Sequence, residues 1–366
     1  MKRILILTAG FGEGHNSAAR GIRDALARIA PADAQVEMHD LFAETYGVAN
    51  DIARSSYLAL INHAPRAWSK VFNWVDRQKN HSASTKPLFM AKNRLARMLA
   101  RFRPDAIVSV YPAYGYMLDE ILGPSGSSWS KRIVIVTDSI TINSIWYRCS
   151  ADYFLVPNEV TAKVLREAGI ASEIIKAPGF PVNPKFADPV SPREAPSDTS
   201  GRRVLYMISA GKAVAPQLVE RLAQIPDIQL TVTVGRDARL QATVENIRNA
   251  AARPFEIVGW SEELPQILRA SHVLVSKAGG ATVQETIAAS CPMIINQIVP
   301  GQEEGNARLI LETKSGTIAE SPELVVEAVQ EAFANGASQW NEWHGNISKL
   351  SRPAASLEIA QLLLSL

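Results

Sequence analysis

The chain has 366 residues, of which 47% are hydrophobic and 20% are charged, and its net charge is +2. This length exceeds what one hydrophobic core usually supports, so we expect two domains, and the composition excludes an extensively disordered or fibrous protein. The only two cysteines, Cys149 and Cys291, exclude a disulfide framework and a cysteine-rich metal site.

The first apolar run reads as a β-strand. Ile4–Thr8 follows Lys2 and Arg3, but it is shorter than the apolar core of a secretory signal peptide and ends in a glycine-rich turn. No segment approaches the roughly 20 apolar residues that a membrane-spanning helix needs. We therefore expect no signal peptide, no transmembrane helix and a cytoplasmic protein. A helix is predicted after the turn, because apolar residues recur at helical spacing at Ala18, Ile22, Ala25, Leu26 and Ile29.

A basic and aromatic stretch lies between Arg54 and Arg103. Residues 1–185 hold 23 Lys and Arg against 16 Asp and Glu, the remainder holds 15 against 20, and this stretch alone holds eleven cations against one acid, Asp76. Aromatic and methionine side chains are interleaved with the cations at Tyr57, Trp68, Phe72, Trp74, Phe89, Met90, Met98 and Phe102. This pattern is typical of segments whose rings enter the acyl boundary while their cations meet anionic headgroups.

Three interpretations of this stretch remain open: membrane docking, which we prefer, an ordinary solvated helix face, and a nucleic-acid surface. The last is disfavoured because no nucleic-acid-binding module accompanies the cations. We therefore expect an anionic membrane surface, and no nucleic acid, as a partner. The residues assigned to docking are Trp68, Lys70, Phe72, Trp74, Arg77, Arg94 and Arg97.

Short apolar runs alternate with helical or loop segments along the rest of the chain. In the N-terminal half the predicted strands are Val36–Met38, Ala106–Val110, Ile133–Thr137 and Tyr153–Val156. In the C-terminal half they are Val204–Ile208, Leu230–Val234, Phe255–Val258, His272–Val275 and Pro292–Asn296. This alternation indicates two α/β domains, each with a parallel sheet and crossover helices.

The domain boundaries follow from composition. Residues 187–203 are rich in proline, serine and charge and poor in apolar residues, so they read as a linker or long surface loop. We therefore predict an N-terminal domain at 1–186 and a C-terminal domain at 204–345. The last apolar segment, Leu357–Leu366, predicts a helix within 346–366 that packs back on one of the domains, preferably the N-terminal one.

The first segment that carries chemistry is TAGFGEGHNSAARG, from Thr8 to Gly21. Its glycines, Gly10, Gly12 and Gly14, allow a sharp turn and a close approach to a ligand before a helix N-terminus. The spacing G-x-G-x-G differs from the dinucleotide fingerprint, so no nicotinamide cofactor is implied. His15 lies at the carboxyl end of the strand, where it is either a general base or simply a cap or packing residue.

The second segment runs from Ser276 to Asn306. Gly279 and Gly280 form a tight turn before a helix over Ala281–Ala289, and such a turn is an anion site suited to a pyrophosphate without a metal. Glu285, one turn into this helix, can accept hydrogen bonds from ribose hydroxyls. Amides and carboxylates in the following loop, Pro300–Asn306, suit a hydroxyl-rich sugar, although a solvated loop is the alternative.

These two segments carry a family resemblance. SKAGGATVQE…PMIINQIVPGQEEGN, with FGEGHNSAA near the start, resembles the diacylglycerol glycosyltransferases, which include monogalactosyldiacylglycerol synthase and the processive diacylglycerol glucosyltransferases and are related to MurG. Intermediate landmarks agree in order: VTDSITINSIWYRCSADYFLVPNE from Val136, GFPVNPKF from Gly179, VGRDARL from Val234 and VGWSEELPQIL from Val258. The resemblance covers nearly the whole chain.

The resemblance implies a GT-B fold, in which two Rossmann-like domains with parallel sheets face a central cleft. The lipid acceptor would bind the N-terminal domain and the UDP-sugar the C-terminal one. The implied donor residues are Gly279, Gly280 and Thr282 for the diphosphate, Glu285 for the ribose, Gln302 and Glu303 for the sugar hydroxyls, and Val258 to Trp260 near uracil. The implied acceptor-side residues are His15, as base or electrostatic helper, Asp138, as orienting group or alternative base, and the loop glycines Gly12 and Gly14.

The chain departs from the family pattern at three places, one of which is the segment that follows Asp138. Ala278 stands where many members have proline, and residues 209–212 replace a more glycine-rich turn on the phosphate side of the site. In that turn Gly211 is kept, and Lys212 is expected to compensate by supplying positive charge near the phosphates.

The implied activity is inverting, metal-independent transfer of a hexose from UDP-glucose or UDP-galactose to a lipid, preferably diacylglycerol, at the inner face of the cell membrane. No cofactor or bound metal is expected. Three alternatives remain: MurG-like transfer to a polyprenyl-linked acceptor, a soluble UDP-sugar epimerase, and a non-catalytic UDP-sugar sensor.

Overall fold

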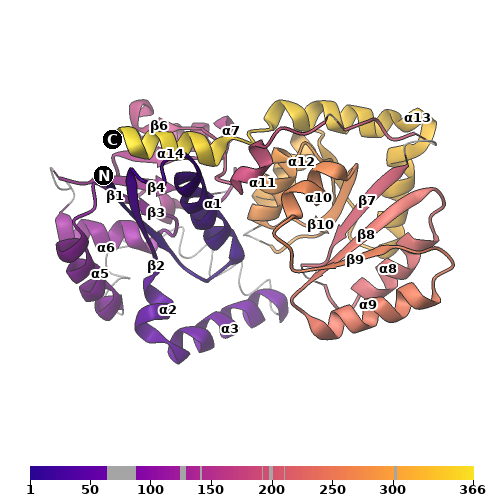
Figure 1. Ribbon diagram of the computed structural model, residues 1–366, viewed down its shortest axis with the longest axis horizontal. Helices are drawn as coiled ribbons and strands as arrows, with labels where there is room; N and C mark the ends of the chain where they lie inside the picture. The colour runs from indigo at the N-terminus through magenta and orange to yellow at the C-terminus, as the bar shows by residue number, and fades with distance from the viewer. Residues whose placement is uncertain are drawn as a thin grey trace. The chain divides into compact units, whose positions relative to one another are not determined.

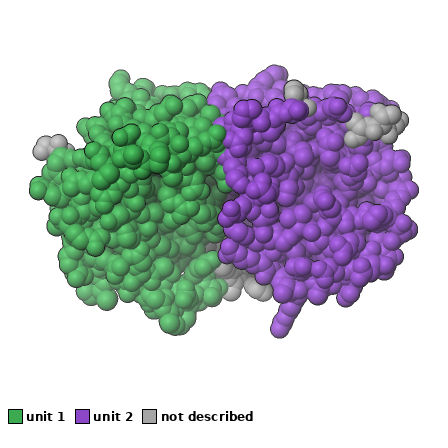
Figure 2. Space-filling view, viewed as in Figure 1, with its two compact units in different colours: residues 1–184, 299–305, 354–366 green, residues 185–298, 306–353 purple. Residues whose placement is uncertain are grey.

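The chain folds into two compact units in a computed structural model that describes residues 1–63, 88–123, 129–140, 142–191, 193–197, 201–209, 211–300 and 303–366. Unit 1 comprises Met1–Pro184, Val299–Gly305 and Ala354–Leu366, and unit 2 comprises Lys185–Ile298 and Asn306–Pro353 (Figure 2). The chain thus first enters unit 2 at Lys185, and residues 187–203, predicted as a linker or loop, are part of that unit.

Unit 1 contains a six-stranded parallel sheet in the order β2-β1-β3-β4-β5-β6. Its strands are β1 (Lys2–Thr8), β2 (Ala34–Asp40), β3 (Ala106–Ser109), β4 (Lys131–Ile135), β5 (Tyr153–Leu155) and β6 (Ile175–Lys176). The apolar run Ile4–Leu7 is fully buried, as expected for a central strand covered by helices on both faces. The strand order reverses between β1 and β3, which makes the carboxyl ends of these strands the expected ligand-binding edge.

Helices cover the sheet of unit 1 (Figure 1). They are α1 (Glu13–Ile29), α2 (Leu41–Tyr46), α3 (Val48–His63), α5 (Phe89–Phe102), α6 (Ala113–Leu122), α7 (Glu159–Glu167) and α14 (Ala355–Ser365), with short 3-10 turns at Ser144–Trp146, Ser172–Ile174 and Pro184–Ala187. The predicted apolar stripe of α1 is buried except at Ile29, which is 37% exposed. The C-terminal helix α14 packs against α1, so the end of the chain returns to unit 1. No helix within the described ranges is both long and apolar enough to cross a bilayer.

Unit 2 contains a second six-stranded parallel sheet in the order β12-β11-β10-β7-β8-β9. Its strands are β7 (Arg202–Met207), β8 (Ile228–Gly235), β9 (Glu256–Gly259), β10 (Val273–Lys277), β11 (Met293–Gln297) and β12 (Gly316–Ile318). Numbered from the first strand of the unit, this order is 6-5-4-1-2-3, which is the Rossmann order. The predicted fold class, two Rossmann-like units with parallel sheets, is therefore confirmed.

The helices of unit 2 are α8 (Ala215–Gln224), α9 (Ala238–Ala250), α10 (Leu264–Ala270), α11 (Gly280–Ala288), α12 (Glu304–Glu312) and α13 (Pro322–Leu350). The backbone of α13 breaks at Ala334–Ala337, where Asn335, Gly336 and Ala337 have positive φ. The predicted end of the C-terminal domain at residue 345 falls inside α13, which continues to Leu350 before the chain leaves unit 2 after Pro353.

Candidate active site

The two predicted catalytic side chains of unit 1, His15 and Asp138, both contact Trp146. The Nδ1 atom of His15 lies 3.1 Å from the hydroxyl oxygen of Thr137, and the His15 ring lies 5.2 Å from the Tyr111 ring and 5.8 Å from the Trp146 ring. The indole N–H of Trp146 donates a 2.7 Å hydrogen bond to Asp138. These residues follow β1, β3 and β4, so the parallel sheet gathers them at one edge.

Burial shifts the proton affinities of both residues. It lowers the pKa of His15 to about 4, although a hydrogen bond to the backbone of Val110 opposes this shift. The imidazole is therefore neutral near pH 7. Burial raises the pKa of Asp138 to about 6, and the hydrogen bond from Trp146 opposes that rise. A carboxyl group with a pKa near the working pH is well matched to general base catalysis.

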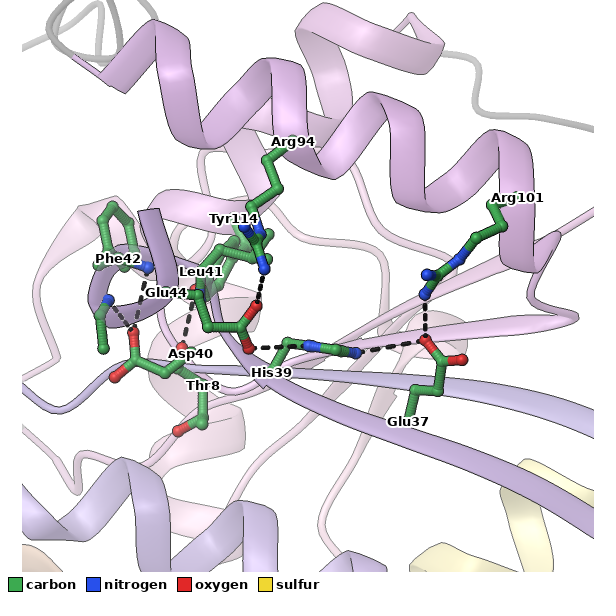
Figure 3. Close-up of polar contacts among 11 residues, drawn as sticks. Thr8, Glu37, His39, Asp40, Leu41, Phe42, Glu44, Arg94, Arg101 and Tyr114 are labelled. Carbon is green, nitrogen blue, oxygen red and sulfur yellow. Dashed lines mark hydrogen bonds and ion pairs between the residues drawn. The ribbon is translucent and has the colours of Figure 1, made fainter. Parts of the chain in front are cut away.

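The glycine-rich loop before α1 is held by Asp40, the last residue of β2. One carboxylate oxygen of Asp40 accepts a 2.8 Å hydrogen bond from the Gly10 N–H. The other accepts from the N–H groups of Phe42 and Ala43 at the start of α2, as the dashed lines at Asp40 in Figure 3 show. Gly12 has φ 149°, a conformation that favours glycine. Gly14 lies in the first turn of α1. Asp40 thus links the glycine-rich loop to the start of α2.

Tyr114, which the sequence does not single out, links β1 to α2 through two hydrogen bonds of its hydroxyl group. Its buried hydroxyl accepts a 3.0 Å hydrogen bond from the Leu41 N–H and donates a 2.8 Å bond to the Thr8 carbonyl (Figure 3). Burial and the nearby Asp40 charge raise the pKa of Tyr114, so the hydroxyl stays protonated and able to donate. Its ring also packs against Phe42 and Tyr111.

We expect Tyr114→Phe to lower the free energy of unfolding by about 1–2 kcal/mol, because it leaves buried backbone groups without a partner. Denaturant unfolding of the variant and of Tyr116→Phe measures this. Tyr116 is the matched control, since its hydroxyl donates to the Ile145 carbonyl outside this cluster. An unchanged stability of Tyr114→Phe would contradict the expectation.

Of the two docking residues predicted on α5, Arg94 forms an ion pair, as does the nearby Arg101. Arg94 contacts Glu44 at 2.7 Å, and Arg101 contacts Glu37 at 3.2 Å, while His39 bridges both acids (Figure 3). The side chain of Arg97 is exposed, and its Nε donates to the Asn93 carbonyl of the same helix.

The apolar residues of the basic stretch separate into two groups. Phe89 and Met90 are 56% and 47% exposed, whereas Met98 and Phe102 are 7% and 5% exposed. Met98 and Phe102, which are interleaved with the cations in the sequence, thus lie on the core side of α5. Trp68, Lys70, Phe72, Trp74 and Arg77 lie outside the described residues.

The predicted diphosphate turn of unit 2 brings cationic and polar groups together at the end of β10, beside the strand-order reversal between β7 and β10. Gly279 is the N-cap of α11 and provides no side-chain cap, so the first N–H groups of the helix lack intrahelical acceptors. A Cβ atom placed on Gly279 would lie 3.4 Å from the Lys277 ammonium and 3.7 Å from the Thr282 hydroxyl. An ammonium group, a hydroxyl group and helix N–H groups therefore converge where an anion would bind.

Lys212, predicted to supply positive charge from the turn at residues 209–212, forms an ion pair in the structure. Its ammonium lies 2.5 Å from the Asp237 carboxylate, which also caps α9, and this pairing lowers the pKa of Asp237. Lys277, which the sequence does not single out as a ligand, provides an ammonium group at the turn before α11. Gly211 at the end of β7 has φ 64°, and Gln297 Oε1 lies 3.0 Å from where its Cβ would be.

The other predicted donor residues surround the same sheet edge. Trp260 is 58% exposed after β9, and the Arg236 guanidinium lies 4.4 Å from its ring centre. Val258 is in β9, and Glu285 is half-buried in α11. Asn306, at the start of α12, donates a 3.1 Å hydrogen bond to the Ala278 carbonyl and so ties that helix to the turn.

The loop predicted to hold the sugar is described from Glu303 onward. Glu303 is 5% exposed, and its carboxylate accepts a 3.0 Å hydrogen bond from the Val299 N–H. This hydrogen bond joins Val299 to Glu303 and occupies one oxygen of the Glu303 carboxylate. Gln302 lies outside the described residues.

The chain matches two family profiles: Monogalactosyldiacylglycerol (MGDG) synthase over residues 15–182, and Glycosyltransferase family 28 C-terminal domain over residues 206–354. It is 29% identical to a monogalactosyldiacylglycerol synthase of Spinacia oleracea, covering 98% of this chain and 71% of the relative. It is 23% identical to a processive diacylglycerol beta-glucosyltransferase of Bacillus subtilis, covering 91% of this chain and 87% of the relative.

Similar solved structures agree on the fold. MurG from Acinetobacter baumannii has a TM-score of 0.63 at 14% identity, with 100% of both chains covered. The S. aureus MnaA–UDP co-structure has a TM-score of 0.61 at 12% identity, with 98% of this chain and 95% of that chain covered. The chain is therefore a glycosyltransferase of GT-B fold that is similar, over most of its length, to the monogalactosyldiacylglycerol synthases and the processive diacylglycerol glucosyltransferases.

Proposed function

We propose that this glycosyltransferase moves a hexose from a UDP-sugar to diacylglycerol at a membrane surface, with inversion at the anomeric carbon. The observation that carries the proposal is the turn before α11, where Lys277 and Thr282 lie at the uncapped N-terminus of the helix. The names of the spinach and B. subtilis relatives support diacylglycerol as the acceptor.

On the donor side, the diphosphate would bind the first N–H groups of α11. The helix dipole, the Lys277 ammonium and the Thr282 hydroxyl would stabilise the negative charge that UDP carries away as leaving group, without a bound metal. Glu285 would accept hydrogen bonds from the ribose, and the exposed Trp260 ring would lie near uracil.

On the acceptor side, Asp138 would act as the base. Its carboxylate would take the proton from the acceptor hydroxyl while that oxygen bonds to the anomeric carbon and the bond from this carbon to UDP breaks. Attack opposite to the departing UDP inverts the configuration. The neutral imidazole of His15 would orient the acceptor by hydrogen bonding, since its lowered pKa makes it the weaker base of the two.

A lipid acceptor requires contact with a bilayer, and we propose that the protein binds the inner face of the cell membrane from the cytoplasm. Exposed apolar side chains in unit 1 support a docking face around α3 and α5. They are Val48, Ile52, Phe89 and Met90, and Arg97 lies on the same helix as the last two.

Incubation with UDP-glucose or UDP-galactose and diacylglycerol vesicles tests the activity. We expect release of UDP and a glycolipid of inverted anomeric configuration, with EDTA having no effect. No lipid product with either donor would contradict the proposal. Transfer only to a polyprenyl phosphate lipid indicates a MurG-like enzyme, conversion of the UDP-sugar without acceptor indicates an epimerase, and binding without turnover indicates a sensor.

A substitution in the docking face is expected to weaken vesicle binding. Phe89→Asp is expected to weaken binding to anionic vesicles about tenfold in co-sedimentation at low salt, because a ring that would be buried among acyl chains becomes a charge. Leu324→Asp is the matched control, since Leu324 is 50% exposed on unit 2. Equal vesicle binding by the two variants would argue against the docking face.

A further inference from the structure

The carboxyl end of α11 is capped by backbone hydrogen bonds and also by side chains. Ser290 adopts φ 50° just after the helix, and the N–H groups of Ser290 and Cys291 donate to the carbonyls of Ile287 and Thr286. These two bonds form a Schellman motif, which ends the helix. They leave the carbonyls of Ala288, Ala289 and Ser290 to be satisfied by other groups.

Two side chains from distant parts of the sequence satisfy these carbonyls. The Arg193 guanidinium donates to Ala289 at 2.9 Å and to Ser290 at 2.8 Å. The hydroxyl of Ser351 donates to Ala288 at 3.0 Å. A cation at the carboxyl end of a helix also interacts favourably with the helix dipole.

Arg193 holds a second helix with the same guanidinium. Its Nε donates to the Arg269 carbonyl at 2.9 Å, and one terminal nitrogen donates to the Leu268 carbonyl at 3.2 Å, both at the carboxyl end of α10. The planar fork of arginine can make such divergent bonds, whereas the ammonium of lysine cannot reproduce their geometry. Arg193 therefore fixes the end of α11 relative to α10.

The position of these capping residues along the chain has a consequence for α11. Arg193 lies in the segment by which the chain first enters unit 2 at Lys185, and Ser351 lies in the segment by which it finally leaves after Pro353. Both segments thus contact the carboxyl end of the nine-residue helix α11. The amino end of this helix lies at the turn that contains Lys277 and Thr282. A helix this short is marginal by itself, so its placement depends on packing and end contacts.

We propose that Arg193 is a positioning residue for the donor diphosphate, acting through α11. It holds the carboxyl end of the helix so that the N–H groups and the Thr282 hydroxyl at the opposite end stay in place relative to Lys277 at the end of β10. The proposal rests on the proposed donor site, because it assigns a role in binding at that turn. Loosening the far end would let the helix shift, and small displacements of oriented binding groups weaken binding strongly.

The test is calorimetric titration of UDP into the whole protein, at a temperature well below each melting temperature. We expect Arg193→Met to raise the Kd for UDP about five- to tenfold, and Arg193→Lys and Ser351→Ala to raise it less. Arg203→Met is the matched control, because Arg203 donates to the Ala270 carbonyl and so caps α10 but not α11. We expect this control to leave the Kd for UDP unchanged even if it melts earlier.

A purely structural role predicts a lower melting temperature for Arg193→Met with an unchanged Kd for UDP, and this result would overturn the proposal. If Arg193→Met does not fold, unchanged UDP binding by both Arg193→Lys and Ser351→Ala would overturn it equally. Failure of the wild-type protein to bind UDP would instead refute the donor site, and the positioning role with it. The wild-type titration therefore separates the two failures.

Discussion

Replacing Asp138 by asparagine is expected to lower kcat about 10²–10⁴-fold, because the amide cannot accept the acceptor proton in the transition state. The Kd for UDP should stay unchanged, since Asp138 lies in unit 1 and the proposed donor turn in unit 2. Steady-state kinetics with saturating UDP-sugar and diacylglycerol vesicles, beside titration with UDP, measure both quantities.

The pH dependence of kcat identifies the base. Burial raises the pKa of Asp138 to about 6, so the rate should fall as the pH drops below about 6 and the carboxylate becomes protonated. Trp146→Phe removes the hydrogen bond that lowers this pKa, so the acid limb should move to higher pH. An acid limb near pH 4 together with an active Asp138→Asn variant would assign the base to His15, whose pKa is about 4.

Replacing Lys277 by methionine is expected to raise the Kd for UDP about 10–100-fold, because a charge-assisted bond to the diphosphate contributes about 1.5–3 kcal/mol. The KM for the UDP-sugar should rise by a similar factor. Methionine keeps the apolar length of the side chain, so packing against α11 is largely retained. Titration with UDP and initial rates over a range of UDP-sugar concentrations check the prediction.

Lys212→Met is the matched control for Lys277→Met. The sequence predicts Lys212 as the compensating charge of the donor site, but its ammonium pairs with Asp237. We therefore expect Lys212→Met to change UDP binding less than Lys277→Met does, since the Asp237 carboxylate already neutralises the Lys212 charge. A larger loss of UDP affinity in Lys212→Met than in Lys277→Met would reverse this assignment.

The sequence correctly predicts the strands and helices that have a clear local pattern of apolar residues. The continuous apolar run at Ile4–Leu7 and the helical spacing in α1 predict a buried strand and a covering helix, and both are present. The sequence does not predict β6 and β12, because each contains a single isoleucine and no apolar run, whereas the similarly short β5 is predicted from the apolar run that begins at Tyr153. Interleaving with cations along the chain does not show which side of α5 faces the core, and only the structure shows that Met98 and Phe102 are buried.

The sequence by itself determined the α/β class, the two parallel sheets, the two glycine-rich turns and the family resemblance, because these depend on periodicity and on short motifs. Only the tertiary structure decided which side chains meet. Trp146 contacts both His15 and Asp138, Lys277 lies at the turn before α11 while Lys212 pairs with Asp237, and Arg193 and Ser351 contact the carboxyl end of α11. Such contacts join residues far apart in the chain, and packing sets them, whereas spacing places a residue only along its own element.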